Sequence, residues 1–202
     1  MSLDDAATRH AVFLQRYAAG LGRRFSTEIF QTYQTVLDEL DKVDVTTARA
    51  ARLATLQLDL EQLMTGAHDS AKLKIMAELA ELAESEVAWS AQLINSNIAN
   101  MTTALPTVGQ VTAAYSLQDF EVTPRSKVNL EQALQQFGRN GSEAVKRVVR
   151  DGIVMGETNQ TIATRIQSQQ RIAKHHAQSI ARTATNHVSN VARTQVYGAN
   201  ID

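Results

Sequence analysis

The chain has 202 residues, a formal net charge of −1 from 20 Lys and Arg against 21 Asp and Glu, and 44% hydrophobic residues with only 5% aromatics. That hydrophobic share is too high for a disordered polymer, and the length is sufficient to bury a core in one or two domains. The absence of Cys excludes disulfides, thiolate metal sites and cysteine nucleophiles. We expect no membrane span and no secretory signal, since no apolar run approaches roughly 18 residues and the N-terminus lacks a basic segment followed by an apolar one.

The composition also predicts the fold class. Nine Gly, two Pro and abundant Ala, Leu and Gln favour helix, so we expect an all-α fold. Apolar residues recur at three- and four-residue steps through residues 1–101, which predicts an antiparallel helical bundle with a long fourth helix. The expected helices cover residues 5–22, 26–41, 46–66 and 69–101, with Gly20, Gly22 and Gly66 as helix ends and Ser26 as a cap.

The fourth expected helix has a broad apolar face. One stripe carries Ile75, Leu79, Leu82, Trp89 and Leu93 at near-heptad spacing, and a second stripe runs from Met76 to Met101. A face this wide has to be covered by other helices, so we interpret it, including Trp89, as bundle core. The acidic residues of the same segment are expected on its exterior: Glu78, Glu81, Glu84 and Glu86.

Residues 102–123 lose the helical period. Because this stretch contains Pro106, Gly109 and a β-like alternation over 108–112, we expect an irregular connector. A smaller helical domain over residues 124–202 follows, opened by Thr123 as cap and Pro124 at the first helical position. Its expected landmarks are a stop at Gly138, a turn at Asn140–Gly141, a helix end and tight turn at Gly152 and Gly156, a short helix over 158–167 and a long one over 169–197.

The near-zero net charge is the sum of two unlike halves. Residues 1–101 carry a net charge of −5, whereas residues 102–202 carry +4. No Asp or Glu occurs between Glu157 and Asp202, a run of 44 residues that contains several cations. A local basic surface on this run is therefore expected.

Helical geometry sorts the last segment into two faces. Ala173, Ala177, Ile180, Ala184, Val188 and Val191 gather on one side. The other side is basic and hydroxylated, with Arg171, Lys174, Gln178, Arg182, Thr185, Ser189 and Arg193. Two interpretations remain open: a solvated face whose counter-charges come from elsewhere in the fold, or a docking surface for a polyanion or an acidic protein.

Catalytic and metal-binding patterns are weak. His175, His176 and His187 have no carboxylate within a helical turn, and no HExxH is present, so we expect no metal. Phosphate-binding glycine loops and nucleophile elbows are also absent from the sequence. We therefore predict a non-enzymatic protein without a cofactor, and a hydrolase that uses His175 or His176 is a distant alternative.

The C-terminal part of the chain, from about residue 140 to 197, resembles the head morphogenesis or minor head family of tailed phages, typified by the F protein of phage Mu. The residues that carry the resemblance are the helix end Val148–Gly156, the opening of a helix at Thr158 with Ile162 and Ile166, and the segment Ala181-Arg182-Thr183-Ala184-Thr185-Asn186. One departure is Ala184, where relatives often place Glu. Residues 1–101 show no family pattern.

The resemblance implies a minor structural protein of the virion that acts in head morphogenesis and in genome packaging or ejection. The implied partners are the portal protein, packaged double-stranded DNA and other head or ejection proteins, with multiple copies around the portal. The implied location is the head interior or portal vertex, after assembly in the host cytoplasm. The residues expected to contact DNA or portal are Arg165, Arg171, Lys174, Arg182, Thr183, Thr185, Asn186 and Arg193. The alternative from another class is a helical-bundle adaptor unrelated to phage, supported by the wide apolar face of residues 73–101.

Overall fold

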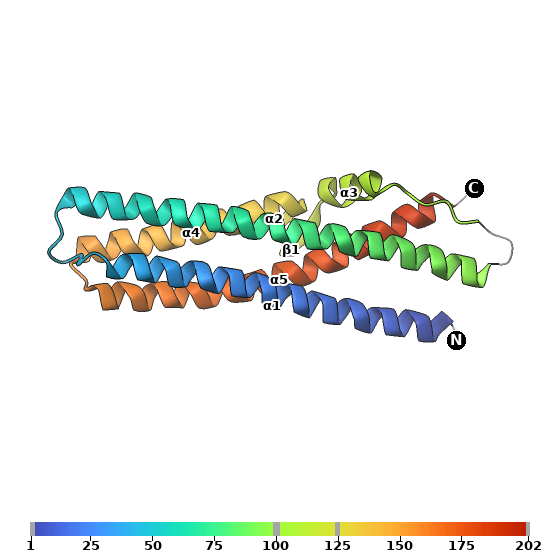
Figure 1. Ribbon diagram of the computed structural model, residues 1–202, viewed down its shortest axis with the longest axis horizontal. Coiled ribbons are helices and arrows are strands. Elements are labelled where there is room, and N and C mark those ends of the chain that lie inside the picture. The colour runs from blue at the N-terminus through green and yellow to red at the C-terminus, as the bar shows by residue number, and fades with distance from the viewer. Residues whose placement is uncertain (1–2, 99–101, 124–125, 201–202) are drawn as a thin grey trace. The chain divides into compact units, whose positions relative to one another are not determined.

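The computed structural model describes residues 3–98, 102–123 and 126–200. These residues form long helices, one short helix and a two-stranded antiparallel hairpin (Figure 1). The elements are α1 (Leu3–Asp41), α2 (Ala50–Asn97), α3 (Val108–Leu117), β1 (Phe120–Thr123), β2 (Ser126–Val128), α4 (Leu130–Met155) and α5 (Asn159–Gly198). The all-α fold predicted from the composition is confirmed. None of the described helices has the length and apolar character that a membrane span requires.

Two compact units divide the chain, and each is built from segments that are distant in the sequence. Unit 1 comprises Met1–Gly22, Lys74–Ala133 and Ile180–Asp202, whereas unit 2 comprises Arg23–Leu73 and Leu134–Ser179. The boundaries of these units differ from the expected domain boundaries at residues 101 and 123. The reason is that α1, α2 and α5 each contribute one part of their length to each unit.

α1 and α2 continue through the glycines that were expected to end helices. Gly20 and Gly22 lie inside α1, and Gly66 lies inside α2, so the predicted ends are wrong. Ser26 is also internal and buried, and its hydroxyl donates to the Arg23 carbonyl at 2.9 Å rather than capping a new helix. A glycine costs about 1 kcal/mol inside a helix, which the burial of a single large apolar side chain nearby offsets at about 2 kcal/mol.

The glycines of α4 make room for a histidine. Gly138 and Gly141 were expected to stop and turn the chain, yet both lie inside α4. A Cβ atom at Gly138 would lie 3.0 Å from Cβ of His68, and one at Gly141 would lie 3.1 Å from its Nε2. The two glycines therefore leave the space that the His68 ring fills in unit 2.

The turn between α4 and α5 agrees with the sequence at two positions. Gly156 has φ of +68°, and it ends α4 with hydrogen bonds from Gly156 N to Ile153 O at 3.1 Å and from Glu157 N to Gly152 O at 2.9 Å. Thr158 opens the next helix, as expected, because its hydroxyl accepts from Thr161 N at 3.3 Å. The expected break near residue 168 is absent, and α5 is one continuous helix.

Asn159 joins three backbone groups of α1 and its following loop. Its Nδ2 donates to Leu40 O at 2.8 Å and to Val43 O at 2.7 Å. Its Oδ1 accepts from Val45 N at 3.1 Å. One side chain thus satisfies carbonyls at the C-terminal end of α1 that have no partner within that helix.

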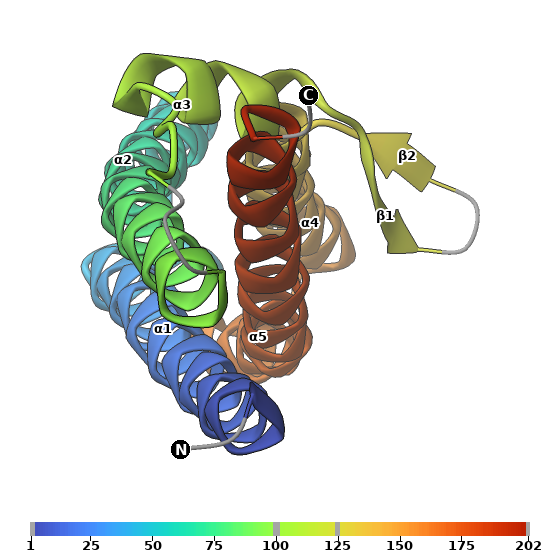
Figure 2. The same ribbon diagram turned by 90° about the vertical axis from the view of Figure 1, so that its right-hand side faces the viewer.

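The expected connector contains regular structure. Thr107 and Gln110 form a capping box that opens α3, so the apparent β-like alternation over 108–112 is the start of a helix. Thr123 belongs to β1 rather than to a helix cap, and the following helix begins at Leu130, with Asn129 accepting from Gln132 N at 2.9 Å. The expectations for Met101 and Pro124 lie outside the described residues. The hairpin lies beside the C-terminal half of α5 (Figure 2), where Phe120 stacks on His187 with centroids 4.8 Å apart.

Each unit has its own core of aliphatic and aromatic side chains. In unit 2 the buried residues include Phe25, Ile29, Tyr33, Leu40, Leu60, Met64, Val149, Ile162 and Ile166. In unit 1 they include Leu21, Ile75, Leu79, Leu82, Tyr115, Leu130, Ile180, Val188 and Val196. Burial raises the pKa of the Tyr33 phenol to about 12. The stripe of residues 75–82 on α2 is core, as predicted.

We predict that Gly152→Ala destabilises the protein by about 1–3 kcal/mol, because the new Cβ would lie 2.5 Å from Cγ1 and 2.7 Å from Cδ1 of Ile162. Gly66→Ala is the matched control, since no atom lies within 4 Å of the added Cβ. That control is expected to gain up to about 1 kcal/mol. Urea unfolding followed by circular dichroism measures both, and equal stability of the two variants would contradict the close packing of α4 on Ile162.

Candidate functional site

The buried face of α5 is wider than the sequence suggested. Thr185 and Ser189 were assigned to the polar side, yet both are fully buried in unit 1 alongside Ala181, Ala184 and Val188. The Thr185 hydroxyl donates to Ala181 O at 2.8 Å, which satisfies it inside the helix. The assignment of these two hydroxyls to an outer face is therefore wrong, because small side chains let neighbouring helices cover more of the circumference.

The remaining predicted contact residues differ in exposure. Arg171, Lys174, Arg182 and Asn186 are exposed, while Thr183 is half-buried. Within the described part of the chain, none of the three cations makes an ion pair with another residue. They are the part of the predicted basic face that stays open to a partner.

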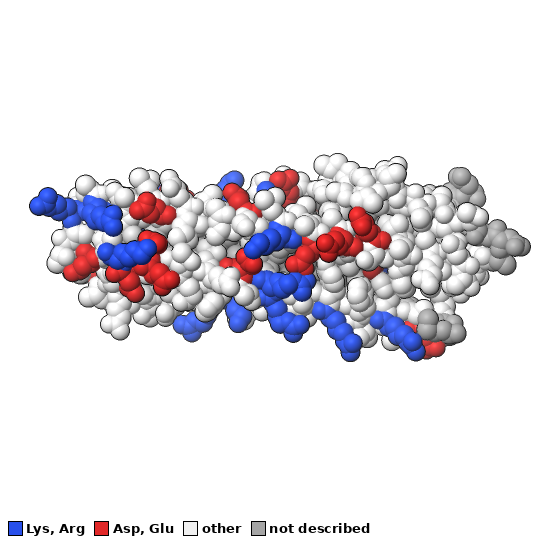
Figure 3. Space-filling model, in the orientation of Figure 1, with Lys and Arg blue, Asp and Glu red and all other residues white. Residues whose placement is uncertain are grey.

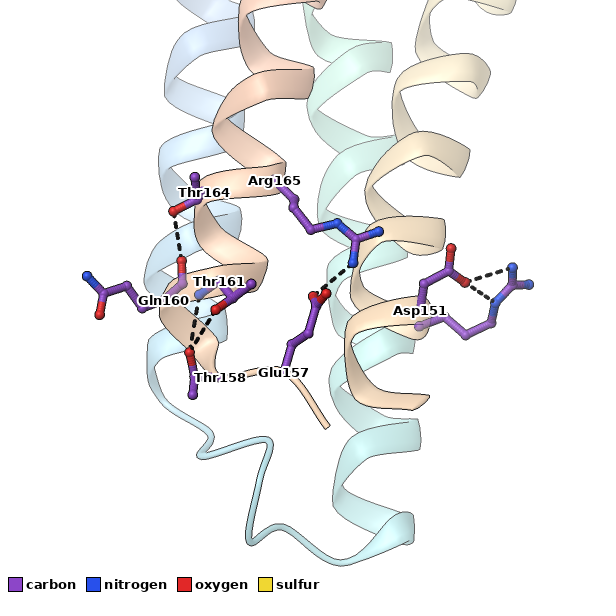
Figure 4. A network of polar contacts seen from close by, with 8 residues as sticks. Asp151, Glu157, Thr158, Gln160, Thr161, Thr164 and Arg165 are labelled. Atoms are coloured by element: carbon purple, nitrogen blue, oxygen red, sulfur yellow. Dashed lines mark hydrogen bonds and ion pairs between the residues drawn. The ribbon is translucent and has the colours of Figure 1, made fainter. Parts of the chain in front are cut away.

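Arg165 has an acidic partner close by. Its Nη1 lies 2.8 Å from Oε2 of Glu157, the last acid before the acid-free run (Figure 4). Arg165 and Glu157 are both partly buried, at 35% and 21% exposure. Arg165 also precedes Arg171 by six residues, which places it about 120° away around the helix. It therefore does not share a face with the exposed cations.

Arg193 belongs to a buried polar cluster in unit 1. The centre of this cluster is Glu86, whose side chain has 0% exposure although it was expected on the exterior. Oε2 of Glu86 accepts from Ser189 Oγ at 2.6 Å and from Arg193 Nε at 3.1 Å. His10 Nε2 lies 2.7 Å from Oε1, out of line for a hydrogen bond. Three helices, α1, α2 and α5, thus converge on one carboxylate.

Trp89 completes the Glu86 cluster. The His10 ring stacks on the indole with centroids 3.6 Å apart and an interplanar angle of 10°. The Arg193 guanidinium carbon lies 4.9 Å from the centroid of the same ring. Trp89 was expected in the bundle core, but it is only partly buried, and its indole contacts two polar side chains, those of His10 and Arg193.

A signal for the position of Glu86 was present in the sequence. The apolar stripe of Ile75, Leu79, Leu82, Trp89 and Leu93 has a gap of seven residues between Leu82 and Trp89, and Glu86 fills it at the four-residue step. An acid at a core position requires buried partners. Those partners come from the two ends of the chain, and no local pattern links them to Glu86.

The geometry of the Glu86 cluster favours a structural role over catalysis. Serine, histidine and a carboxylate are the residue types of a nucleophilic triad. Here, however, the Ser189 hydroxyl donates to the carboxylate rather than to the imidazole, and all three side chains are buried. The arrangement neutralises a buried charge and does not activate the hydroxyl.

His68 is the buried histidine of unit 2. Its Nδ1 lies 2.6 Å from Met64 O, so Nδ1 carries the proton and donates, and the ring meets Phe137 edge-on. Nε2 is buried and has no hydrogen-bond partner among the described residues. Burial lowers the pKa of this imidazole below its usual 6.5, with the Met64 carbonyl and Asp69 opposing that effect.

The other histidines lie on α5. His175 and His176 are exposed on α5, and His187 Nε2 donates to Tyr115 O at 2.9 Å, which fixes α3 to α5 within unit 1. In the described residues, no group of three or more His, Asp or Glu side chains is arranged to hold a metal ion.

Comparison of the chain with protein-family models, with curated proteins and with solved structures finds no match. The similarity of residues 140–197 to phage head morphogenesis proteins therefore stays a prediction. The structure shows a row of exposed cations on α5 and two buried polar groups, around Glu86 and His68, that lie between helices.

We predict that Glu86→Gln destabilises the protein by about 2–3 kcal/mol, because Arg193 loses a buried counter-charge. The control is Glu84→Gln, an exposed acid of the same helix, for which we expect a change within about 0.5 kcal/mol. Trp89 is the only tryptophan, so its fluorescence reports both the cluster and unfolding. Equal urea midpoints for the two variants would show that the carboxylate is not needed.

We predict that His68 makes stability depend on pH. Because its pKa is lowered in the folded state, the unfolded chain binds the proton more readily, and the free energy of unfolding should fall as pH drops below about 6.5. His68→Asn, which keeps a donor near the Nδ1 position, should flatten this dependence, and His175→Asn should leave it unchanged. Urea unfolding between pH 5 and pH 7.5 measures the slope. An unaltered slope in the His68 variant would assign the dependence to other groups.

Proposed function

We propose that this chain is a non-enzymatic structural protein of a tailed-phage head, which docks on the portal ring and contacts packaged DNA through the exposed cations of α5. The proposed DNA contact rests on the exposure of Arg171, Lys174 and Arg182 and on their lack of acidic partners. All three are exposed, and none has an acidic partner among the described residues. The helix that carries them contains no Asp or Glu.

The three cations share one side of α5. Arg182 follows Arg171 by eleven residues, which is close to three helical turns, and Lys174 lies within one turn of Arg171. Cations in such a row can neutralise successive phosphates and release their counterions. The exposed Asn186, one turn after Arg182, can add a hydrogen bond to a phosphate oxygen.

Charges on other parts of the surface are mixed. Around the loop that joins α1 to α2, at the left of Figure 3, Lys and Arg lie among Asp and Glu. One of these contacts is the ion pair between Lys42 and Glu39, on a largely exposed surface. Mixed charge of this kind offers a polyanion no net attraction, which favours α5 as the contact surface.

The place in the virion rests on the resemblance of residues 140–197 to minor head proteins. In that role the chain sits in multiple copies at the portal vertex or in the head interior, after assembly in the host cytoplasm. Its partners are then the portal protein, packaged double-stranded DNA and other head or ejection proteins. The proposal uses no catalytic group and no cofactor.

A second candidate function is that of a helical-bundle adaptor for another protein. It is favoured by a groove of 470 Å³ in unit 1, whose lining combines apolar residues with polar ones: Leu3, Ala6, Trp89 and Leu93, and Gln92, Ser96 and Asn97. Two apolar side chains in the N-terminal part of α1, Leu3 and Phe13, are 52% and 45% exposed. Such a surface fits a protein partner rather than DNA.

We predict that duplex DNA binds with a strong salt dependence that the three cations supply. Replacing Arg171, Lys174 and Arg182 with Gln should reduce the slope of log K against log salt by about 2.7, at about 0.9 for each phosphate contact. The matched control replaces Arg9, Arg16 and Arg52, which are exposed cations of α1 and α2, and should keep the slope. Fluorescence anisotropy with a labelled duplex across a salt series measures both.

Absence of binding at low salt, or equal slopes for the two triple variants, would contradict DNA contact through α5. Co-purification with a portal ring tests the docking part of the proposal independently of DNA. If the chain neither binds DNA through α5 nor co-purifies with a portal ring, the adaptor becomes the better hypothesis.

A further inference from the structure

A polar groove lies in unit 2, between α4 and α5. It has a volume of 330 Å³ and is lined by Ala144, Arg147, Val148, Asp151, Arg165, Ser168 and Gln169. The charged and amide groups of this lining come from both helices. The groove is separate from the exposed cations of α5, because Arg165 lies on a different side of that helix from Arg171 and Lys174.

Two guanidinium groups reach this groove. Arg147 is exposed and makes no ion pair with another described residue. Arg165 extends from α5 toward α4 (Figure 4). Its Nη1 donates to Oε2 of Glu157, which lies in the turn before α5. The other N–H groups of the Arg165 fork stay available, since a guanidinium carries five donors.

The acid in the lining is neutralised locally. Oδ1 of Asp151 accepts from Nε and Nη2 of Arg150 at 3.3 and 3.2 Å. In Figure 4 the Asp151 carboxylate points away from Arg165, so it does not occupy the donors of that residue. The groove thus carries excess positive charge from Arg147, with Gln169 as a further donor.

We propose that this groove binds a phosphate group between Arg147 and Arg165. Paired guanidinium forks give parallel hydrogen bonds to tetrahedral oxyanions, and phosphate offers oxygens to donors on both walls at once. The inference goes beyond the proposed function, because it concerns a different face of α5 and holds even if the exposed cations bind nothing. The phosphate can belong to a nucleic-acid backbone or to a small free anion.

The test is a nuclear magnetic resonance titration of the full chain with inorganic phosphate and, separately, with a short duplex DNA, each at constant ionic strength. We expect saturable shifts at the amides of Arg147, Arg165 and Gln169. Arg147→Gln should weaken binding about tenfold or more, as expected for the loss of a charged hydrogen bond. Asp151→Asn should strengthen it about threefold, since Arg150 is then released toward the groove.

Arg139→Gln is the matched control, an exposed arginine of α4 that does not line this groove, and it should bind as the parent does. Saturation by inorganic phosphate assigns the groove to free anions. Saturation by DNA alone, lost in Arg147→Gln but kept in the Arg171, Lys174 and Arg182 triple variant, assigns it to a nucleic-acid backbone. The proposal is overturned if neither ligand produces saturable shifts, or if Arg139→Gln weakens binding as much as Arg147→Gln.

Discussion

The broad buried face of α5 is the constraint on which the other features depend. In unit 2 this face includes Ile162, Ile166 and Ala177, and in unit 1 it includes Ala184 and Val196. Small residues dominate it, so the covering helices approach closely and enclose Thr185 and Ser189 as well. The residues left outside are those on the narrow opposite side, which is why Arg171, Lys174 and Arg182 remain exposed.

Burying polar groups inside such packing is costly unless partners compensate for their lost hydration. Glu86 has three, from both ends of the chain, and together they compensate for the loss of hydration of a carboxylate. His68 donates from Nδ1 to the Met64 carbonyl, while its buried Nε2 has no hydrogen-bond partner among the described residues. Both groups hold helices at fixed positions, which leaves recognition to the surface of α5 and to the groove beside Arg165.

Local signals predicted the features that depend on a few neighbouring residues. Composition gave the helical class, Thr158 was recognised as a helix opener, and Gly156 as the end of α4. Glycine alone was a poor guide to helix ends, because Gly66 costs only about 1 kcal/mol inside a helix whose other face is buried. Gly138 and Gly141 were misjudged for a different reason, since their role is set by the ring of His68, about 70 residues earlier in the chain.

The sequence by itself determined the all-α fold, the core stripe of residues 75–82 and the acid-free run between Glu157 and Asp202. Each of these follows from periodicity or composition within one segment. Only the tertiary structure decided which polar residues are buried and which cations have partners, since the counter-charge of Arg193 is Glu86 on α2. Such a pairing depends on which segments pack together. The periodic spacing of apolar residues along a helix carries no information about the partner of a single charge.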